Sequence, residues 1–583
     1  MAGILEILDG SRRAMTILRS DLSPALLETI HRARSTGGVP FTEPLVPYAN
    51  IGDLLARQAE AYEEKPFLIY YSDGGKRTEL SYREFYEETC RTANFLQSAG
   101  IVRGDRIATV SFNHSETVIQ YFAAFLIGAA LVPVNAGEDD RRIRYVLGNS
   151  GAKLAFVHDQ FVDRIAGFRE ELPDLRQIVE SGEHTHPDLP HFRTAVQKQS
   201  HRFRPPSAPE LEDVALIVYT SGTTGNPKGV LLVQYNLLVD AMAIAEWHRF
   251  SDDQRMMCVL PIHHVNGIVV TLMTPLYAGG GIVLNQKFHA DRFFERISIE
   301  RVTIVSVVPT LLQFLLHAKL DMVAYKLAHF RHLICGAGPL TVELAQKFEQ
   351  AFKIPIIHGY GLSETTCYSC FLPIDFSRSE HREWMSAHGF PSIGTPLQVN
   401  EMAIHDEQGN ERQEGEKGEI VIRGHNVMAG YFHDPPANEA AFTHGWFRSG
   451  DEGFYMYDEQ GRKEFFITGR IKELIIRGGA NISPFEIDEV LMSLPGIEVG
   501  IAVGFENDWF GEEVGAYVKP KRDVVLSEQQ VINACRRQLP FSKSPKVVIF
   551  GGDVPVTSTG KYQRSKCRDL FGEWKATQFK ENE

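Results

Sequence analysis

The segment VALIVYTSGTTGNPKGV, residues 214–230, is an apolar run that leads directly into a loop of glycines, hydroxyl residues and one lysine. Residues 214–219 are typical of a buried strand. Glycines in the following loop let backbone N–H groups turn inward, and hydroxyl and ammonium groups add further donors. The segment therefore predicts a phosphate-binding loop. Its candidate ligands are Thr220, Ser221, Gly222, Thr223, Thr224, Gly225 and Lys228.

This loop differs from a Walker A loop, because Lys228 is followed by Gly229 and its spacing from Gly222 is wrong. The alternative is an ordinary turn rich in glycine and serine. So many phosphate-binding residue types lie within about ten positions that the phosphate interpretation is preferred.

Short apolar runs alternate with helical segments from about residue 48 to residue 468, a pattern that predicts buried strands in mostly parallel sheets. The clearest runs are 106–111, 154–157, 214–219, 303–307 and 354–357. The segment 418–430 is richer in strand and turn residues and predicts a small β-rich subdomain. From residue 471 to the end, a shorter α/β pattern follows.

The composition is typical of a soluble globular protein, with 43% hydrophobic and 23% charged residues. A length of 583 residues predicts roughly three or four domain-sized units. The chain carries 60 Lys and Arg against 74 Asp and Glu, a formal charge of -14. This balance argues against a general affinity for nucleic acid or anionic lipid, so an anionic substrate would need a local positive site.

The seven cysteines are scattered and odd in number, which predicts reduced thiols and a cytoplasmic protein. Cys367 and Cys370 form a CxxC pair without a second pair at zinc-finger spacing, so two semi-buried thiols are preferred over a zinc site. The first residues lack a basic segment followed by a sustained apolar core, and no apolar stretch is long enough for a membrane span.

The string YTSGTTGNPKGV, residues 219–230, resembles the signature of the adenylate-forming superfamily of acyl-CoA synthetases, peptide-synthetase adenylation domains and beetle luciferases. Further motifs follow in the family's order from about residue 50 to residue 570. The resemblance implies an α/β fold with a large N-terminal lobe of stacked α/β subdomains, a small β-rich subdomain and a mobile α+β C-terminal lobe. We expect an N-terminal extension at 1–45, an AMP-binding domain at 46–469 and a small mobile domain at 470–583. The extension is expected to pack on the body, and a regulatory or membrane-surface role is the alternative.

Two motifs resemble the family's adenine and phosphate segments. GAGPL, residues 336–340, has small residues against which a flat base could lie, and in HGYGLSE, residues 358–364, the tyrosine would stack on adenine. The resemblance implies that Ser363 contacts the α-phosphate and that Glu364 holds Mg²⁺. The nucleotide-binding candidates of the two motifs are Gly336, Ala337, Gly338, Pro339, His358, Gly359, Tyr360 and Ser363.

Three later motifs complete the resemblance. GWFRSGD, residues 445–451, implies that Asp451 accepts hydrogen bonds from the ribose hydroxyls. TGRIKE, residues 468–473, resembles the hinge between the lobes, with Arg470 on ribose or phosphate and Lys472 at the pivot. TGK, residues 559–561, resembles the loop that carries the catalytic lysine, here Lys561.

The chemistry explains why these residue types are needed. A carboxylate is a poor electrophile. When one of its oxygens attacks the α-phosphate of ATP, the acid becomes an acyl-adenylate, from which AMP can leave. Both reactants are anions, so Mg²⁺ on Glu364, loop donors and Lys561 would neutralise them. For the second step, the resemblance implies that the small lobe rotates about the hinge, so that Lys561 leaves and Gly478 and Gly479 approach the arm of coenzyme A. Glycines permit such close approach, and a simple tight turn is the alternative.

PIHHVNG, residues 261–267, resembles the acyl-pocket motif, with His264 where acyl-CoA synthetases usually carry histidine. No acid is present to pair with an amino group, so an amino-acid substrate is disfavoured, and Ile268 replaces the gating Trp of some long-chain enzymes. The expected liners are Val270, Val308, Cys367 and Tyr368. Residues 376–388 form a longer connection than usual, which could shape the pocket mouth, dock a protein or be a surface loop.

The sequence thus predicts an ATP-dependent ligase that forms an acyl-adenylate from a fatty or aryl acid and transfers the acyl group to coenzyme A. A fatty acyl-AMP ligase that loads the phosphopantetheine of a carrier protein is the alternative. A luciferase-like oxygenase and a non-catalytic adenylate-binding protein are less favoured, the latter because Glu364, Asp451, Arg470 and Lys561 are all present.

Overall fold

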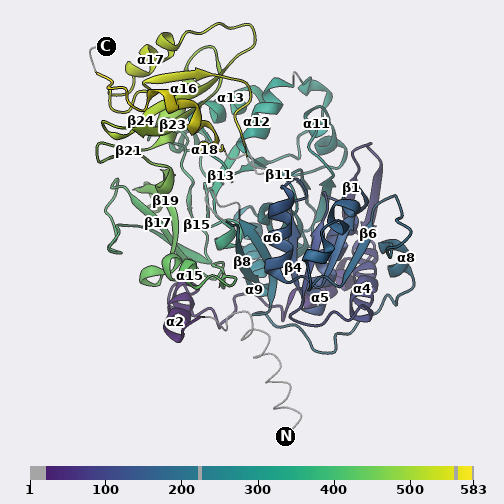
Figure 1. Ribbon diagram of the computed structural model, residues 1–583. Helices are drawn as coiled ribbons and strands as arrows, with labels where there is room; N and C mark the ends of the chain where they lie inside the picture. The colour runs from purple at the N-terminus through teal and green to yellow at the C-terminus, as the bar shows by residue number, and fades with distance from the viewer. Residues whose placement is uncertain (1–21, 221–225, 319, 557–561, 581–583) are drawn as a thin grey trace.

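The computed structural model describes residues 22–220, 226–318, 320–556 and 562–580. Figure 1 shows a large α/β body and a smaller C-terminal lobe in yellow. One hydrophobic core runs through the body from Leu26 to Phe465, whereas the lobe has separate cores that begin at Ile475 and Ile501. The predicted division into a large and a small unit is therefore confirmed, and the separate cores make the lobe a unit in its own right.

The first sheet of the body carries the segment 214–230. In the described chain its strand order is β18 (Gly430–Tyr431), β8 (Lys228–Val233), β7 (Val214–Thr220), β4 (Ala130–Val134), β3 (Arg106–Val110), β5 (Leu154–His158) and β6 (Gln177–Ser181). β7 runs parallel to β4 and antiparallel to β8. The residues after the phosphate loop thus return as a strand, which places Lys228 opposite Thr220.

The second sheet is parallel from β13 to β1, as the apolar runs predicted. Its order is β15 (Thr395–Pro396), β14 (Cys370–Phe371), β13 (Ile356–Tyr360), β12 (His332–Cys335), β11 (Ile304–Val307), β9 (Arg255–Cys258), β10 (Gly281–Asn285), β1 (Pro66–Tyr71) and β2 (Arg77–Ser81). The carboxyl end of β13 carries His358, Gly359 and Tyr360, three of the predicted nucleotide residues.

Helix α9 is buried on nearly every face because it contacts β8 of the first sheet and also η3 (Asn266–Met273), which contacts β9 and β11 of the second. A helix that is apolar all round is typical of such an interior layer.

None of the described helices combines the length and apolar character that a bilayer span requires. The α-helices are α2 (Pro24–Ala33), α3 (Ile51–Tyr62), α4 (Tyr82–Ser98), α5 (Ser115–Ile127), α6 (Asp140–Ser150), α7 (Val162–Ala166), α8 (Phe192–Gln197), α9 (Gln234–Trp247), α10 (Thr274–Ala278), α11 (Ala290–Ile299), α12 (Pro309–His317), α13 (Val342–Phe352), α14 (Arg378–Trp384), α15 (Pro435–Ala441), α16 (Pro484–Ser493), α17 (Glu528–Arg536) and α18 (Ser565–Arg568).

The predicted β-rich subdomain is an antiparallel sheet of β16 (Asn400–His405), β17 (Gly418–Gly424), β19 (Phe447–Tyr457) and β20 (Lys463–Arg470). β20 ends at Arg470, and the short η7 (Ile471–Glu473) leads into the C-terminal lobe. The strands of that lobe are β21 (Ile475–Arg477), β22 (Ala480–Ile482), β23 (Ile497–Asn507), β24 (Gly511–Pro520) and β25 (Val547–Phe550). In Figure 1 the lobe lies above this sheet, with α16 beside α13 of the body.

The described part of the N-terminal extension packs on the body, as expected from its apolar residues. The Arg34 guanidinium is fully buried and donates to both carboxylate oxygens of Glu212, at 2.8 and 2.7 Å. Thr36 and the Gly37 amide donate to Glu401 of β16, at 2.9 and 2.6 Å. The extension thus joins the segment before β7 to the β-rich subdomain.

Candidate active site

A pocket lies between the body and the C-terminal lobe, at the carboxyl ends of β13 and β20. The body supplies the ends of these strands, the start of α13 and Phe390 with Pro391, which follow the long connection after β14. The lobe supplies Glu489, Tyr562 and Arg564. The predicted nucleotide residues that line the pocket are Ala337, Gly338, Pro339, His358, Gly359, Tyr360, Asp451 and Arg470.

Asp451 lies at the centre of this group. The Tyr360 hydroxyl donates to Oδ2 of Asp451 at 2.7 Å, and the Nε atom of Arg470 is 3.2 Å from Oδ1. Asp451 and Arg470 face each other across β19 and β20, so the strand register itself produces this pair. Burial, and then the neighbouring Asp451, raise the pKa of Tyr360 well above its usual value, so the phenol stays a donor.

The oxygen Oδ1 of Asp451 is buried and accepts no aligned hydrogen bond from any described residue. The Arg470 guanidinium is close enough for an ion pair but not aligned as a donor to it. An acceptor held this way at the wall of a pocket is available to a ligand hydroxyl.

A second cluster joins Lys228, Tyr431 and Glu364. The Tyr431 hydroxyl donates to Oε1 of Glu364 at 2.8 Å, and Lys228 Nζ lies 4.8 Å from the centre of the Tyr431 ring. Burial and the Glu364 carboxylate raise the pKa of Tyr431. The structure thus brings together the lysine after the phosphate loop and the predicted magnesium ligand, although they are far apart in the sequence.

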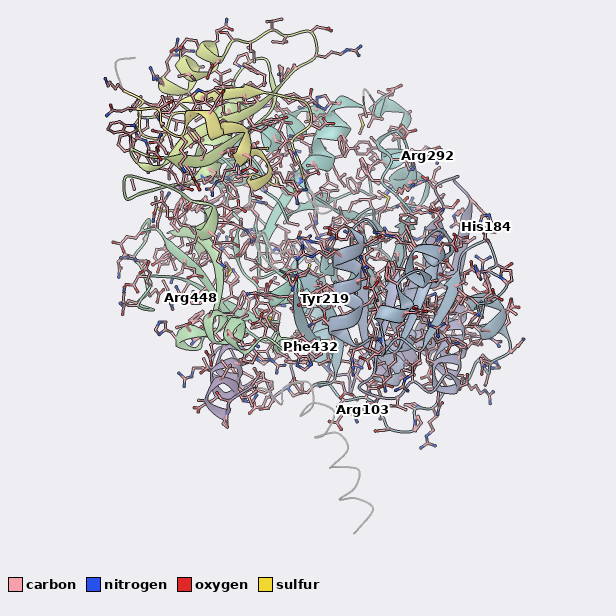
Figure 2. All side chains as sticks on the ribbon, viewed as in Figure 1. Arg103, His184, Tyr219, Arg292, Phe432 and Arg448 are labelled. Atoms are coloured by element: carbon pink, nitrogen blue, oxygen red, sulfur yellow. The ribbon has the colours of Figure 1, made fainter. Side chains whose placement is uncertain are left out.

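Close packing of β7, β8 and β18 fixes the position of this cluster. A Cβ atom on Gly229 would lie 3.2 Å from Cζ of Tyr219 and 3.3 Å from Cβ of Phe432. The Phe432 amide also donates to the Gly229 carbonyl at 2.7 Å. Figure 2 labels Tyr219 and Phe432, which lie near each other in the middle of the body. Because β8 begins at Lys228, this packing determines where the lysine emerges.

Two glycines shape the backbone around the pocket. A Cβ atom on Gly361 would lie 1.9 Å from the Cys367 carbonyl oxygen, so only glycine permits the fold-back that presents Glu364. A Cβ atom on Gly336 would lie 2.6 Å from the Tyr368 hydroxyl. Gly336 is therefore small because of this internal packing, while the three residues after it line the pocket.

The His358 ring lines the pocket and is fixed by the fold. Its Nδ1 atom lies 2.8 Å from the Ser392 carbonyl oxygen, and burial lowers its pKa to about 4, so the imidazole is neutral at ordinary pH. Ser363 begins the short turn η5 (Ser363–Thr365) and is not among the lining residues of the pocket.

The predicted acyl-pocket residues gather around the start of η3. The rings of His263 and His264 lie 4.3 Å apart, and burial, with a smaller effect of His264, lowers the pKa of His263 far below its usual value. Asn266 donates to the Tyr368 hydroxyl at 3.3 Å. Tyr368 and the other expected liners Val270, Val308 and Cys367 are all buried. Cys367 and Cys370 are fully buried thiols rather than semi-buried ones.

The predicted hinge residue, Lys472, and the two glycines predicted to approach coenzyme A lie outside the pocket that the nucleotide residues line. Lys472 is exposed in η7, and Gly478 and Gly479 form the turn between β21 and β22 with φ angles of 58° and 86°. Neither glycine lines the pocket, whereas Tyr562, the residue after Lys561, does. Lys561 itself and loop residues 221–225 lie outside the described residues, so their predicted roles stay predictions.

Several residues of the site were not predicted from the sequence. Tyr431 stands alone beside a glycine, and no spacing pattern marks it. Arg564 is buried against Asp488, with Nη1 3.0 Å from Oδ1, and its Nε atom lies 3.7 Å from Glu473. Its position three residues after Lys561 was the signal available in the sequence, whereas its burial and its pairing with Asp488 are visible only in the structure.

The chain is similar to known proteins both in sequence and in structure. A family model described as AMP-binding enzyme matches residues 55–432, and a model described as AMP-binding enzyme C-terminal domain matches residues 486–561. A sulfoacetate–CoA ligase from Cupriavidus necator is 32% identical over 531 residues, which cover 90% of this chain and 98% of the relative. A feruloyl-CoA synthase from Amycolatopsis sp. is 30% identical and covers 85% of this chain and 94% of its own length.

Among solved structures, MatB from Rhodopseudomonas palustris is similar in two states. The ATP-bound form has a TM-score of 0.79 and the form without ligand a TM-score of 0.69. In both cases the sequences are 28% identical, and the alignment covers 90% of this chain and 99% of MatB. The chain as a whole is therefore more similar to the ATP-bound form than to the form without ligand.

Proposed function

The chain belongs to the AMP-binding enzyme family and is an AMP-forming acid–thiol ligase, and from this premise we propose how its own residues divide the two half-reactions. The observation that carries the proposal is the group of Tyr360, Asp451 and Arg470 at the pocket, beside Lys228, Tyr431 and Glu364. The first three suit a nucleoside, and the second three suit its phosphates.

In the first half-reaction, adenine lies against residues 337–339 and Tyr360, and the free Oδ1 atom of Asp451 accepts from a ribose hydroxyl. Residues 220–228 surround the phosphates. An oxygen of the substrate carboxylate attacks the α-phosphorus, and the bond to pyrophosphate breaks. Lys561 bridges the two anions and stabilises the charge that develops between them.

Magnesium fits the donor set near the phosphates. Glu364 offers a hard carboxylate oxygen, which Mg²⁺ prefers, and Tyr431 orients that carboxylate. The described residues contain no cluster of three or more metal-binding side chains. In the proposed site, phosphate oxygens and water would complete the coordination, as is usual for magnesium. Bound Mg²⁺ would neutralise charge on the phosphates.

The described arrangement suits the first half-reaction. The segment that follows Lys561 faces the pocket through Tyr562 and Arg564, while the Gly478–Gly479 turn lies away from it. The greater similarity to ATP-bound MatB supports this assignment. The thiol step then needs the lobe to turn about residues 470–473, so that Lys561 departs and the glycine turn approaches the acyl-adenylate.

Coenzyme A is the proposed thiol. The relatives are named as CoA ligases, which favours coenzyme A over the phosphopantetheine of a carrier protein. The thiolate attacks the acyl carbon, the acyl–oxygen bond breaks and AMP leaves with the electron pair. We propose that His264 contacts the reacting carboxyl group at the entrance of the acyl pocket.

We assign the acid to the apolar or aryl class, without a second anionic group. The expected liners are uncharged and buried, and Tyr368 is backed by Asp240, whose Oδ2 atom accepts from the Tyr368 amide at 3.4 Å. Burial raises the pKa of Asp240 well above its usual value, which favours the neutral carboxyl. None of the expected liners is a Lys or Arg that could pair with a sulfonate or a second carboxylate. The relatives act on both kinds of acid by name, so identity alone does not choose between them.

The test is acid-dependent exchange of labelled pyrophosphate into ATP, with a panel of aryl, fatty and dianionic acids. We expect exchange with an aryl or apolar acid, little exchange with sulfoacetate, and an acyl-CoA product when coenzyme A is added. The matched variant Lys561→Ala should lose exchange by at least about a hundredfold but still form thioester from supplied acyl-adenylate. Absence of exchange with every acid, or equal loss of both half-reactions in the variant, contradicts the proposal.

A further inference from the structure

A direct polar contact joins the lobe to the body at the edge of the pocket. Glu489 of α16 places its two carboxyl oxygens 3.1 and 3.2 Å from the backbone amide of Val342, the first residue of α13. α16 belongs to the lobe and α13 to the body, and the two helices pack side by side (Figure 1). Glu489 also lines the pocket.

The Val342 amide depends on this contact. The first amides of a helix have no partner inside it. At α13, the Thr341 side chain accepts from Leu344, which leaves Val342 with Glu489 as its described acceptor. If the lobe turned away, this amide would return to water and Glu489 would lose its partner.

The surroundings of Glu489 carry mostly negative charge. Burial raises the pKa of Glu489 to about 8, the Val342 amide opposes that rise, and Asp488 and Glu343 add to it. Lys347 pairs with Glu343, and Arg564 pairs with Asp488, so both nearby cations already have partners. The other titratable groups that line the pocket on the side of the lobe are Glu473 and Tyr562.

We propose that Glu489 is a latch that holds the lobe in the adenylation arrangement by capping helix α13, and that its release accompanies the thiol step. This inference rests on the proposed two-step function. Glu489 is a positioning residue: it acts on the reaction through the placement of the lobe and of the segment that carries Lys561.

The latch makes docking of the lobe dependent on pH. The pKa of Glu489 is higher in the docked lobe than its ordinary value of 4.5, so docking is favoured by protonation. This contribution is complete below pH 4.5 and disappears as the pH rises through 8. Between pH 7 and pH 9 the docked fraction should fall by at most about tenfold relative to a neutral side chain.

Two variants of Glu489 test the latch. Glu489→Ala removes the acceptor, so we expect pyrophosphate exchange to fall by about five- to twentyfold while thioester formation from supplied acyl-adenylate is unchanged or faster. Glu489→Gln keeps an acceptor and cannot ionise. Its exchange rate should exceed that of the original enzyme already at pH 7, and the ratio of the two rates should rise by up to about tenfold more between pH 7 and pH 9.

The control is Glu486→Gln on the same helix, because Glu486 pairs with Lys543 inside the lobe, at 2.8 Å. We expect this variant to behave as the original enzyme in both half-reactions at both pH values. Equal effects of Glu489→Ala on the two half-reactions, or identical pH profiles for Glu489→Gln and the original enzyme, overturn the latch. If Glu489→Ala does not fold, the pH comparison decides alone. Absence of exchange in the original enzyme would instead contradict the proposed function.

Discussion

Replacing Tyr431 by phenylalanine removes one hydroxyl from the proposed magnesium site and leaves the ring in place. The hydroxyl donates to Glu364 at 2.8 Å, whereas the ring still faces Lys228, 4.8 Å away. A buried hydrogen bond to a charged group contributes about 1.5–3 kcal/mol. If that energy orients Glu364 toward the metal during adenylation, its loss slows the step by about 10- to 150-fold at 25 °C.

The assay is acid-dependent pyrophosphate exchange over a range of magnesium concentrations. We expect Tyr431→Phe to need more Mg²⁺ for half-maximal rate, in addition to the lower rate, because a less oriented carboxylate binds the metal more weakly. Tyr455→Phe is the control, since Tyr455 is also buried in the body but its hydroxyl donates to the Arg412 carbonyl, at 3.4 Å, rather than to Glu364. An unchanged rate and magnesium dependence in Tyr431→Phe refutes the role given to this hydrogen bond.

Two further predictions concern stability and the thiol step. Burial raises the pKa of Glu464 to about 7, so its contribution to stability is complete below pH 4.5 and is lost as the pH rises through 7. Glu464→Gln should therefore have the same free energy of unfolding as the original protein near pH 4.5 and exceed it by up to about 3 kcal/mol at pH 8. Urea unfolding measures this free energy at both pH values. A difference between the two proteins that does not change with pH contradicts the prediction. Gly479 adopts a φ of 86°, which L side chains rarely adopt. We expect Gly479→Leu to slow acyl transfer to coenzyme A more than pyrophosphate exchange. A normal transfer rate would contradict the proposal that this turn contacts coenzyme A.

Local patterns in the sequence were sufficient for much of the fold. The apolar runs at 106–111, 154–157 and 214–219 became β3, β5 and β7 because strands buried on both faces need apolar residues at successive positions. The β-rich segment also became part of an antiparallel sheet. Motif order was enough to choose the residues that meet at the pocket, such as Tyr360 and Asp451, 91 positions apart.

Contacts between distant segments without a motif could not be predicted. Tyr431 and Glu364 are 67 positions apart, and Glu489 and Val342 are 147 apart. Periodicity reports which face of an element is buried, but not which other element covers it. The pairing of β8 with β18, and of α13 with α16, depends on how the sheets and the lobe pack, so these partners emerge only from the three-dimensional structure.

The burial of Arg34 has a practical consequence for anyone who shortens this chain. The family model begins at residue 55, which suggests a natural place to cut. Such a cut would remove the Arg34 cation that pairs with Glu212 and two of the donors to Glu401, and would leave apolar residues of the body exposed to solvent. An expression clone designed for crystals should therefore start before Pro24, since helix α2 and the residues that follow it are part of the packed body.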